Sequence, residues 1–396
     1  MSKLDELIQE LCPNGVEYTI FRNVVNYEQP SKYLVKSTDY DDKYNVPVLT
    51  AGQTFILGYT DEREGIYLAS KDSPVIIFDD FTGAFKWVDF PFKIKSSAIK
   101  LLTADEKYTN LRFVYHVMGK LAFSSNEHKR LWISIYSQFS FPLPPLSVQE
   151  EIVRILDNFT ELTAELTAEL TARKKQYEYY HQRLMDFSNQ YVKFVNLGDY
   201  FEFKNGLNKE KSAFGKGYPI VNFTDVYNHR WLNASMLKGL VDVSDLELNR
   251  YSAKKGDVFF TRTSETKEDI GMSSTLIEDI PNCVFSGFVL RARPKTDLFL
   301  PKFCSYYFST NKVRKEIIRY ASVTTRATTT GPKLSRIKIP LVPICEQQRI
   351  VDILDRFDKL CNDISEGLPA EIEARQKQYE YYRDKLLTFK PLEEVK

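Results

Sequence analysis

The same long segment occurs twice in the chain, about 200 residues apart. Ten of the eighteen positions in residues 142–159 are identical to their counterparts in residues 340–357. The segment 172–180, Ala-Arg-Lys-Lys-Gln-Tyr-Glu-Tyr-Tyr, returns with one change at 374–382. A repeat of this length implies two structurally equivalent halves. The alternative interpretation is an old duplication that is kept only for stability.

The repeated segments have the pattern of long amphipathic helices. From Val148 to Phe187, apolar residues recur at steps of mostly three, four or seven, which is typical of a coiled-coil seam. Ser147 to Glu150 matches a capping box and predicts the helix start. The tandem Thr-Ala-Glu-Leu sequence at 163–170 adds four-residue steps, and one such unit can be gained or lost without ending the helix. In the second copy, the Gly-Leu-Pro sequence at 367–369 predicts a break into two helices.

The chain divides into four segments, at residues 1–142, 143–190, 191–339 and 340–396. We expect an α+β protein in which two globular domains are separated by two long helical regions that form an antiparallel coiled coil with an internal pseudo-two-fold repeat. Such a duplicated arrangement suits a target with approximate two-fold symmetry, and duplex DNA is the most common one. The segment charges are −2, −3, +9 and −3. Only the second globular segment is basic enough by itself to neutralise phosphates.

Several classes of protein are disfavoured by what the sequence lacks. No apolar run approaches the roughly 20 residues of a membrane span, and the first residues lack the pattern of a signal peptide, so we expect a cytoplasmic protein. The five cysteines are scattered without a Cys-x-x-Cys pair, which argues against a disulfide framework or a zinc site. Nucleotide-binding glycine motifs and the Asn/Asp-Pro-Pro-Tyr motif of adenine methyltransferases are also missing. We therefore expect no catalytic or metal site.

The order of segments, the Pro-Leu-Pro-Pro-Leu sequence at 142–146, the Gln-Glu-Glu-Ile sequence at 149–152 and the Thr-Ala-Glu-Leu tandem resemble the specificity subunits of type I restriction–modification systems. The likeness is greatest to the subgroup that carries Thr-Ala-Glu-Leu repeats in its central helix. The resemblance implies that each globular segment is a target-recognition domain that reads one half of a bipartite target in double-stranded DNA. It also implies that the helices set the half-site spacing and dock two methyltransferase subunits.

The same resemblance places all catalysis in partner chains. Restriction subunits join the methyltransferase core and supply the ATP-dependent translocase and nuclease, while the methyltransferase modifies adenine at N6. S-adenosylmethionine, ATP and Mg²⁺ would be used by these partners, and this chain would bind no cofactor itself. Two other classes stay open from the residues alone: a scaffold that joins partners other than nucleic acid, and a stand-alone enzyme.

Candidate DNA contacts are hydroxyl, amide and basic side chains in loops, which are common partners of phosphates and base edges. In the first domain they are Thr50, Gln53, Lys71, Thr82 and Lys86, and in the second Thr261, Arg262, Thr263, Thr325, Arg326 and Lys333. The competing interpretation of each residue is a solvated turn.

Four repeated tyrosines on the helices are candidates for docking a partner protein. They are Tyr177 and Tyr180 in the first copy, and Tyr379 and Tyr382 in the second. The alternative is that their rings pack in the helical seam while their hydroxyls reach water.

Overall fold

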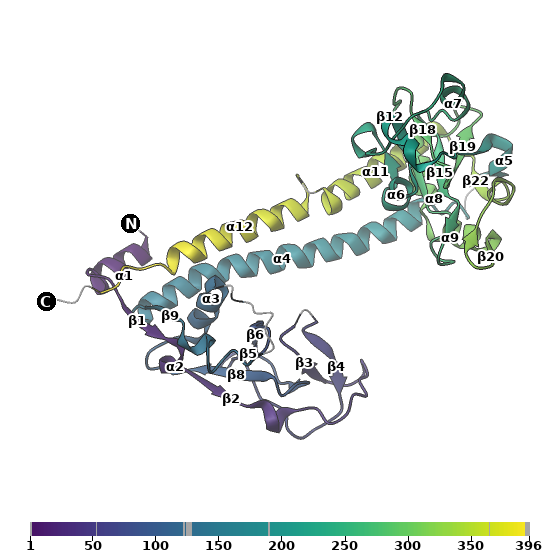
Figure 1. Cartoon of the computed structure of the whole chain (residues 1–396). Coiled ribbons are helices and arrows are strands. Elements are labelled where there is room, and N and C mark those ends of the chain that lie inside the picture. Colours follow the sequence, from purple (N-terminus) through teal and green to yellow (C-terminus); the bar gives the residue numbers. More distant parts are fainter. Residues whose placement is uncertain are drawn as a thin grey trace. The chain divides into compact units, whose positions relative to one another are not determined.

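The computed structural model describes residues 2–52, 54–121, 123, 129–188, 191–363 and 365–392. The chain forms two compact units, which are considered separately (Figure 1). Unit 1 comprises Met1–Thr167 and Glu371–Lys396, and unit 2 comprises Ala168–Ala370. Each unit therefore combines one globular segment with part of both helical regions.

The helical regions form three helices, α4 (Leu146–Leu184), α11 (Ile344–Asn362) and α12 (Leu368–Leu386). With 39 residues, α4 is about 58 Å long at 1.5 Å per residue. The predicted break in the second region is confirmed, because α11 and α12 are separate helices. A Cβ atom at Gly367 would lie 2.6 Å from the carbonyl oxygens of Asp363 and Lys359, so the turn between them requires glycine.

The predicted cap of α4 is wrong by two residues. The backbone N–H groups of Val148 and Gln149 donate to the carbonyl oxygen of Pro145, which places Ser147 inside the first turn. Ser147 cannot be the N-cap, because the carbonyl of Pro145 already accepts the first helical hydrogen bonds.

The globular part of unit 1 contains a four-stranded and a three-stranded sheet. One has the order β2-β8-β5-β6 and the other β4-β3-β7. The strands of the first are β2 (Val25–Glu28), β8 (Ile99–Ala104), β5 (Val75–Asp79) and β6 (Phe85–Val88), and those of the second are β4 (Ile56–Thr60), β3 (Val46–Leu49) and β7 (Lys93–Ile94). Strand β5 is buried on both faces, with Ile76 and Phe78 in the core that includes the start of α4, and Val75 and Ile77 in a second core.

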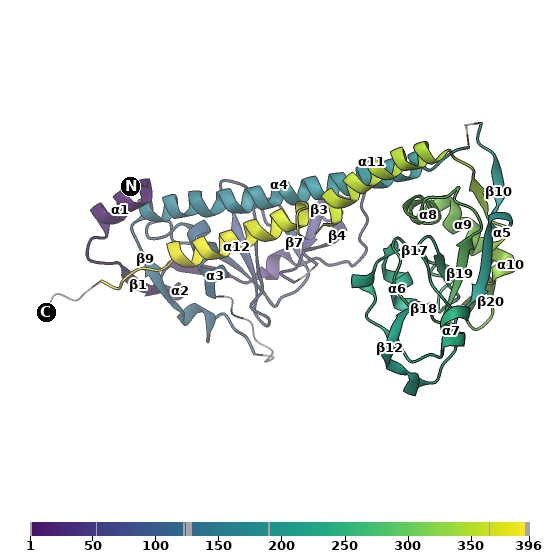
Figure 2. The same cartoon turned by 90° about the horizontal axis from the view of Figure 1, so that it is seen from above.

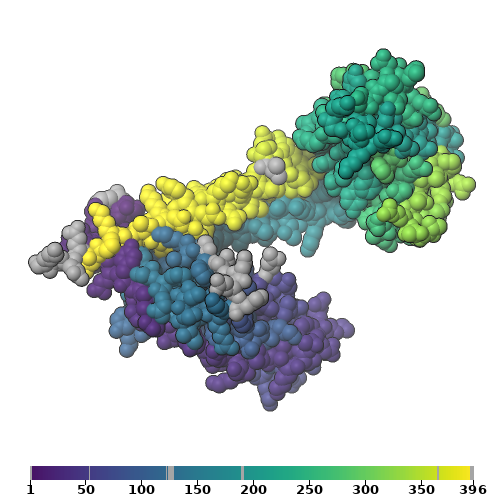
Figure 3. Space-filling view, in the orientation of Figure 1, coloured from purple at the N-terminus to yellow at the C-terminus, as the bar shows by residue number. Residues whose placement is uncertain are grey.

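Shorter elements complete unit 1. The helices are α1 (Lys3–Leu11), α2 (Phe21–Val24) and α3 (Leu111–Leu121), with 3₁₀ turns η1 (Pro30–Tyr33) and η2 (Tyr136–Gln138). Strands β1 (Glu17–Ile20) and β9 (Ser140–Leu143) pair antiparallel and close the globular part. The chain leaving α12 lies beside β1, since Val16 N–H donates to the carbonyl of Lys390 and Leu392 N–H to that of Val16 (Figures 2 and 3).

Unit 2 is built on a five-stranded sheet of order β11-β19-β15-β17-β13, and α8 packs against β15, β17 and α11 (Figure 2). Its strands are β11 (Phe201–Asn205), β19 (Val289–Pro294), β15 (Val258–Thr261), β17 (Ser273–Leu276) and β13 (Trp231–Leu232). A second sheet has the order β14-β12-β18, with β14 (Leu240–Val241), β12 (Phe214–Val221) and β18 (Val284–Phe285). A third, β16-β21-β20, is formed by β16 (Thr263–Ser264), β21 (Ala327–Thr328) and β20 (Ser322–Val323).

Strands β10 (Phe194–Asn196) and β22 (Lys338–Pro340) pair antiparallel at the base of unit 2, as β1 and β9 do in unit 1. The helices of unit 2 outside the long regions are α5 (Leu197–Tyr200), α6 (Phe223–Asn228), α7 (Asp245–Arg250), α8 (Pro301–Phe308), α9 (Asn311–Tyr320) and α10 (Gly331–Leu334), with 3₁₀ turns η3 (Lys211–Ala213) and η4 (Ala234–Met236). Both globular parts thus mix helices and strands, in agreement with the expected α+β class.

Candidate nucleic-acid interface

The small sheet β16-β21-β20 brings together predicted residues that are far apart in the sequence. Thr263 in β16 pairs with Thr328 in β21, and the side chain of Arg326 lies 2.8 Å from Glu265. Lys333, in α10, donates to the hydroxyl of Ser322 in β20. Thr325, between β20 and β21, is exposed. Hydroxyls and basic groups from three chain segments therefore share one surface.

Arg262 and Thr261 have different environments although they are neighbours. The half-buried guanidinium of Arg262 has no ion-pair partner among the described residues. Thr261, in contrast, is fully buried, and its hydroxyl accepts a hydrogen bond of 2.9 Å from the N–H of Met272. Because this hydroxyl is used inside the main sheet, we leave Thr261 out of the candidate interface.

A hollow of about 500 Å³ lies beside the small sheet and combines aromatic with polar walls. Phe223 and Tyr227 of α6 stack with ring centroids 5.7 Å apart, and Phe288 is 67% exposed. Thr263 and Arg326 line the same hollow. Apolar contact with a thymine methyl group and hydrogen bonding to base edges are both within the chemistry of these side chains.

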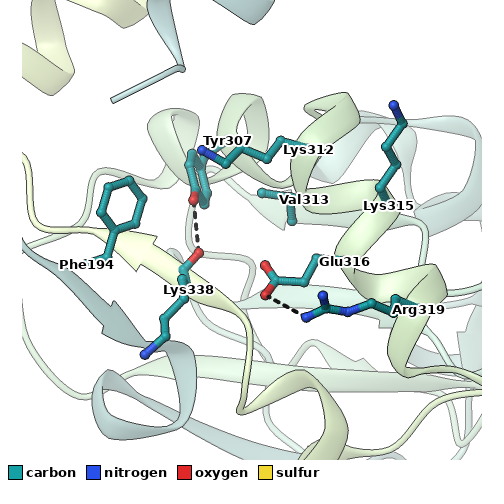
Figure 4. Close-up of a pocket in the computed structure, with 8 residues that line it drawn as sticks. All are labelled: Phe194, Tyr307, Lys312, Val313, Lys315, Glu316, Arg319 and Lys338. Atoms are coloured by element: carbon teal, nitrogen blue, oxygen red, sulfur yellow. Dashed lines mark hydrogen bonds and ion pairs between the residues drawn. The ribbon is translucent and has the colours of Figure 1, made fainter. Parts of the chain in front are cut away.

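A second hollow, of about 470 Å³, lies along α9 and is basic (Figure 4). Lys312, Lys315 and Arg319 come from α9, and Lys338 comes from β22. Arg319 is 3.9 Å from Glu316, the one carboxylate among the lining residues. The sequence signal for this surface was the spacing of three basic residues along one helix face, and it was not among the predicted sites.

Helix α9 continues almost directly into the small sheet, because Tyr320 ends the helix and Ser322 begins β20. The basic hollow and the polar sheet are therefore connected through consecutive residues. Cations beside hydroxyls and exposed rings can bind phosphates and contact bases within one unit.

The predicted DNA contacts of unit 1 are more scattered than those of unit 2. Thr50 bonds within its own loop, to the carbonyl of Thr54, and Gln53 lies outside the described residues. Lys71 precedes β5, whereas Thr82 lies in the turn between β5 and β6. The whole of β5, which has five residues, lies between these two positions in the chain. Lys86 is paired with Ile77 in the middle of the hairpin.

Two buried glutamines anchor the globular parts to the helices. The side-chain oxygen of Gln149 accepts from the hydroxyl of Thr109 and the N–H of Asn110, each at 3.0 Å. Its amide donates to the carbonyls of Tyr108 and Pro144. In unit 2, Gln347 accepts from the N–H of Leu300 and donates to the carbonyls of Leu298 and Val342. The two repeated glutamines therefore make corresponding contacts.

Two repeated aspartates show the same correspondence. In unit 1, Arg112 donates to Asp157 at 2.8 Å and His116 Nε2 is 2.9 Å from the same carboxylate. In unit 2, Lys302 and Tyr306 donate to Asp355 at 2.6 and 2.7 Å. Burial opposes ionisation of Asp157, but the bond to His116 and the charge of Arg112 outweigh it and lower its pKa. Arg112 and Lys302, and likewise His116 and Tyr306, are thus structural equivalents.

The four repeated tyrosines pack within their own units. Tyr382 stacks on Phe159 in unit 1, and Tyr180 stacks on Phe357 in unit 2, where each Phe is the repeat partner of the other. The hydroxyl of Tyr379 is 3.0 Å from His116 Nδ1. Tyr177 is 7% exposed and accepts a hydrogen bond from Arg230, and burial raises its pKa to about 12.

The tyrosines that point outward are their neighbours. Tyr179 is 55% exposed and its repeat partner Tyr381 is 62% exposed. Both belong to the duplicated Tyr-Glu-Tyr-Tyr sequence. The periodicity of the sequence could not say which rings of this motif the helix contacts would cover.

His116 and His181, both buried among the described residues, should make the two units less stable in mild acid. Burial lowers the pKa of His116 and of His181, so each is held neutral in the folded protein. As the pH falls below the ordinary value of 6.5, the unfolded chain takes up these protons first, and stability is lost. We expect thermal unfolding at pH 5 to occur well below that at pH 7.5, and His116→Gln to reduce this dependence in unit 1. The exposed His229→Gln serves as control, and an equal pH dependence in all three proteins would contradict the assignment.

Within the described ranges, no group of three or more His, Cys, Asp or Glu side chains is arranged to hold a metal ion. The described helices also include none that is long and apolar enough to cross a membrane.

Comparison with known proteins agrees with this architecture. The type I restriction modification DNA specificity domain matches the chain twice, at residues 17–173 and 189–374. The chain is 42% identical to the type I restriction enzyme EcoR124I/EcoR124II specificity subunit of Escherichia coli over 100% of both chains. It is 32% identical to a putative type I restriction enzyme specificity subunit of Haemophilus influenzae, over 94% of this chain and 96% of that one.

Two solved structures share the fold. The S subunit of a type I restriction–modification system from M. genitalium matches with a TM-score of 0.56 at 14% identity, covering 94% of this chain and 96% of that one. A chain from a study of complex assembly and conformational transition in the type I system matches with a TM-score of 0.57 at 16% identity, covering 95% and 98%. The chain therefore belongs to the type I restriction–modification DNA specificity family, and its function is that of a specificity subunit.

Proposed function

We propose that each unit reads one half of a bipartite target in double-stranded DNA. In unit 2, the reading surface is the small sheet β16-β21-β20 with the hollow beside it, and the basic groups of α9 hold the phosphate backbone. The observation that carries this assignment is the convergence of Arg262, Thr263, Arg326 and Lys333 on that sheet. In unit 1, the segments that bear Thr50, Lys71, Thr82 and Lys86 are proposed to take the same role, together with Gln53, which lies outside the described residues.

The long helices are proposed to form an antiparallel coiled coil with a pseudo-two-fold relation between the halves. The support is that Phe159 meets Tyr382 in unit 1 and Phe357 meets Tyr180 in unit 2. The start of each repeated segment thus contacts the end of the other copy. Because α4 is continuous from Leu146 to Leu184, its length would set the separation of the two half-sites.

Catalysis is assigned to partner subunits. Two methyltransferase subunits would dock on the duplicated frame, transfer a methyl group from S-adenosylmethionine to adenine N6, and act in the cytoplasm where the DNA lies. Restriction subunits would add ATP- and Mg²⁺-dependent translocation and cleavage. Tyr177, Tyr379 and Tyr382 are covered by other side chains, and Tyr180, which is 37% exposed, stacks on Phe357. The more exposed Tyr179 and Tyr381 are therefore better candidates for direct partner contact.

Reconstitution tests the whole assignment. The purified chain alone should transfer no methyl group, and the chain mixed with the methyltransferase subunit of its own system should methylate a defined set of sites. Sequencing of the methylated adenines would show a target with two specific parts and a nonspecific gap. Methyl transfer by this chain alone, or a target without two parts, would contradict the proposal.

Charge reversal at Arg262 should weaken binding to the half-site of unit 2. If the guanidinium meets a phosphate, Arg262→Glu should weaken binding roughly tenfold and reduce the salt dependence, by about one unit in the slope of log K against log salt. If it reads guanine, the loss is about 1–3 kcal/mol and confined to one base pair. Fluorescence anisotropy at several salt concentrations separates these cases. Arg250→Glu, at an exposed position at the end of α7, is the matched control and should change neither quantity.

A further inference from the structure

The main sheets of the two units have the same strand order. In unit 1 the order is β2-β8-β5-β6, and the first four strands of the unit 2 sheet, β11-β19-β15-β17, repeat it with antiparallel pairing throughout. The second sheets, β4-β3-β7 and β14-β12-β18, also agree in strand order and direction. The two globular parts therefore share one fold although their sequences have diverged, and their residues can be aligned through the structure.

The alignment starts from the cations that bind the repeated aspartates. Arg112 and Lys302 are equivalent by these contacts. Leu102 of β8 therefore corresponds to Ala292 of β19, since each lies ten residues before its cation. The register of the main sheets extends this correspondence to the neighbouring strands.

Ile76 in β5 and Val258 in β15 lie opposite these two strand residues and therefore correspond as well. Four residues further along the chain, Asp80 corresponds to Arg262. The turn that leaves β5 is thus the counterpart of the segment that leads from β15 into the small sheet of unit 2.

The repeated helical segments give a second, independent alignment. Leu131 and Thr329 each lie eleven residues before the start of their repeated segment, at 142 and 340. The N–H of Leu131 donates to the carbonyl of Asp80 at 2.8 Å, and the N–H of Thr329 donates to the carbonyl of Arg262 at 3.0 Å. Both alignments therefore meet at the same hydrogen bond, which brings the same two chain segments together in each unit.

The residues beside this bond in unit 1 take the places of the small sheet. Phe81 corresponds to Thr263, and Arg130 corresponds to Thr328. These two threonines pair in unit 2, where β16 meets β21. Thr82 follows Phe81, and it is the one unit 1 candidate that lies in this turn.

The side chains at these places have the same chemistry as the surface of unit 2. The ring of Phe81 is 37% exposed. Thr82, Lys129 and Arg130 are exposed as well. A hydroxyl, two cations and an accessible ring are groups that contact phosphates, base edges and thymine methyl groups.

The carboxylates of the same turn are already occupied. Asp80 is buried 3.2 Å from the ammonium group of Lys100, and its Oδ1 accepts a hydrogen bond from the N–H of Trp132 at 2.7 Å. Oδ1 of Asp79 accepts from two backbone N–H groups of the turn, at 2.9 and 3.0 Å. The cations therefore dominate the accessible charge of this surface, as the binding of phosphates requires.

We propose that unit 1 reads its half-site through the surface formed by Phe81, Thr82, Lys129 and Arg130. The cations hold the phosphate backbone, while the ring of Phe81 contacts a base. This inference rests on the proposed function and narrows it to the segment that bears Thr82.

The environment of Lys71 supports this narrowing. Lys71 precedes β5, whereas the proposed surface follows the end of that strand. The hollow that Lys71 lines also includes four carboxylates and the start of α4. An excess of carboxylates repels phosphates, so this end of β5 is the less suitable place for DNA.

Substitutions at Arg130 and Phe81 test the proposal in the complex reconstituted with the methyltransferase subunit of the same system. Arg130→Glu should weaken binding to the target duplex about tenfold and lower the slope of log K against log salt by about one. Phe81→Ser should reduce the preference at one base pair by at least about fivefold. Thr263→Ala should act on a base pair of the other half-site. Sequencing of methylated adenines from a library of randomised targets measures both preferences.

Lys107→Glu is the matched control for charge. Lys107 is exposed and follows the end of β8 at Ala104, whereas the strand's other end at Ile99 pairs with Asp79 beside the proposed surface. It should change neither affinity nor base preference. Arg130→Gln, which removes the charge without reversing it, should show a smaller loss than Arg130→Glu. Thermal unfolding confirms that each variant is folded.

The outcomes separate this inference from the proposed function. Unchanged affinity and base preference in folded Arg130→Glu and Phe81→Ser would overturn the inference, as would a loss in Lys71→Glu without one in Arg130→Glu. In both cases a bipartite target would leave the proposed function standing. Changes by Phe81→Ser and Thr263→Ala in the same half-site would show that the two surfaces are not equivalent. A wild-type target without two parts would overturn the proposed function together with this inference.

Discussion

Insertion of one more Thr-Ala-Glu-Leu unit after Leu170 should lengthen the gap between the two half-sites by one or two base pairs, with both half-sequences retained. Four helical residues add about 6 Å, close to two base-pair rises of 3.4 Å, and rotate the distal end by about 40°. The insertion lies inside the continuous helix α4, whereas α11 and α12 are separate helices. We expect one base pair rather than two, because the rotation of the helix end and the tilt of the helix to the DNA axis take up part of the added helical length.

The measurement is the set of methylated sites for each spacer length in the reconstituted complex. A length-preserving control replaces residues 167–170 by Ala-Glu-Ala-Leu and should leave the gap unchanged. Deletion of one unit should shorten the gap or abolish binding. An unchanged gap after insertion, or altered bases in either half-site, would show that α4 does not set the spacing.

Replacement of Gln149 by Leu should destabilise unit 1 by at least about 3 kcal/mol while leaving unit 2 nearly unaffected. The amide of Gln149 satisfies one hydroxyl, one N–H and two carbonyl groups that are largely buried, and each group left unpaired costs about 1–3 kcal/mol. Gln347→Leu should have the reciprocal effect on unit 2. Hydrogen exchange read by peptides from each unit measures the two effects separately.

The exposed neighbour Gln348 supplies the control. Its amide donates only to Asp352 on the helix surface, so Gln348→Leu should cost little in either unit. A global loss of protection in Gln149→Leu, equal in both units, would mean that the units unfold together. No loss at all would mean that the buried glutamine is not the anchor of the globular part.

The sequence alone was sufficient to recognise the repeat and the family resemblance and to predict the long helices. Apolar spacing depends on local periodicity, so α4 and the break at Gly367 could be predicted to within a few residues. Gln149 and Gln347 were visible as identities, but their bonding partners were not. The capping prediction at Ser147 failed because the helix begins at Leu146, where the carbonyl of Pro145 accepts the first helical hydrogen bonds.

Only the tertiary structure determined which diverged residues are equivalent. His116 and Tyr306 differ in chemistry and lie outside the repeat, yet each bonds the aspartate of its own unit. In the same way, folding buried Thr261 and joined Arg262 to Lys333 through the small sheet. Burial and proximity depend on the packing of elements far apart in the chain. Residue type could therefore predict the chemistry of the DNA surface, but not which residues form it.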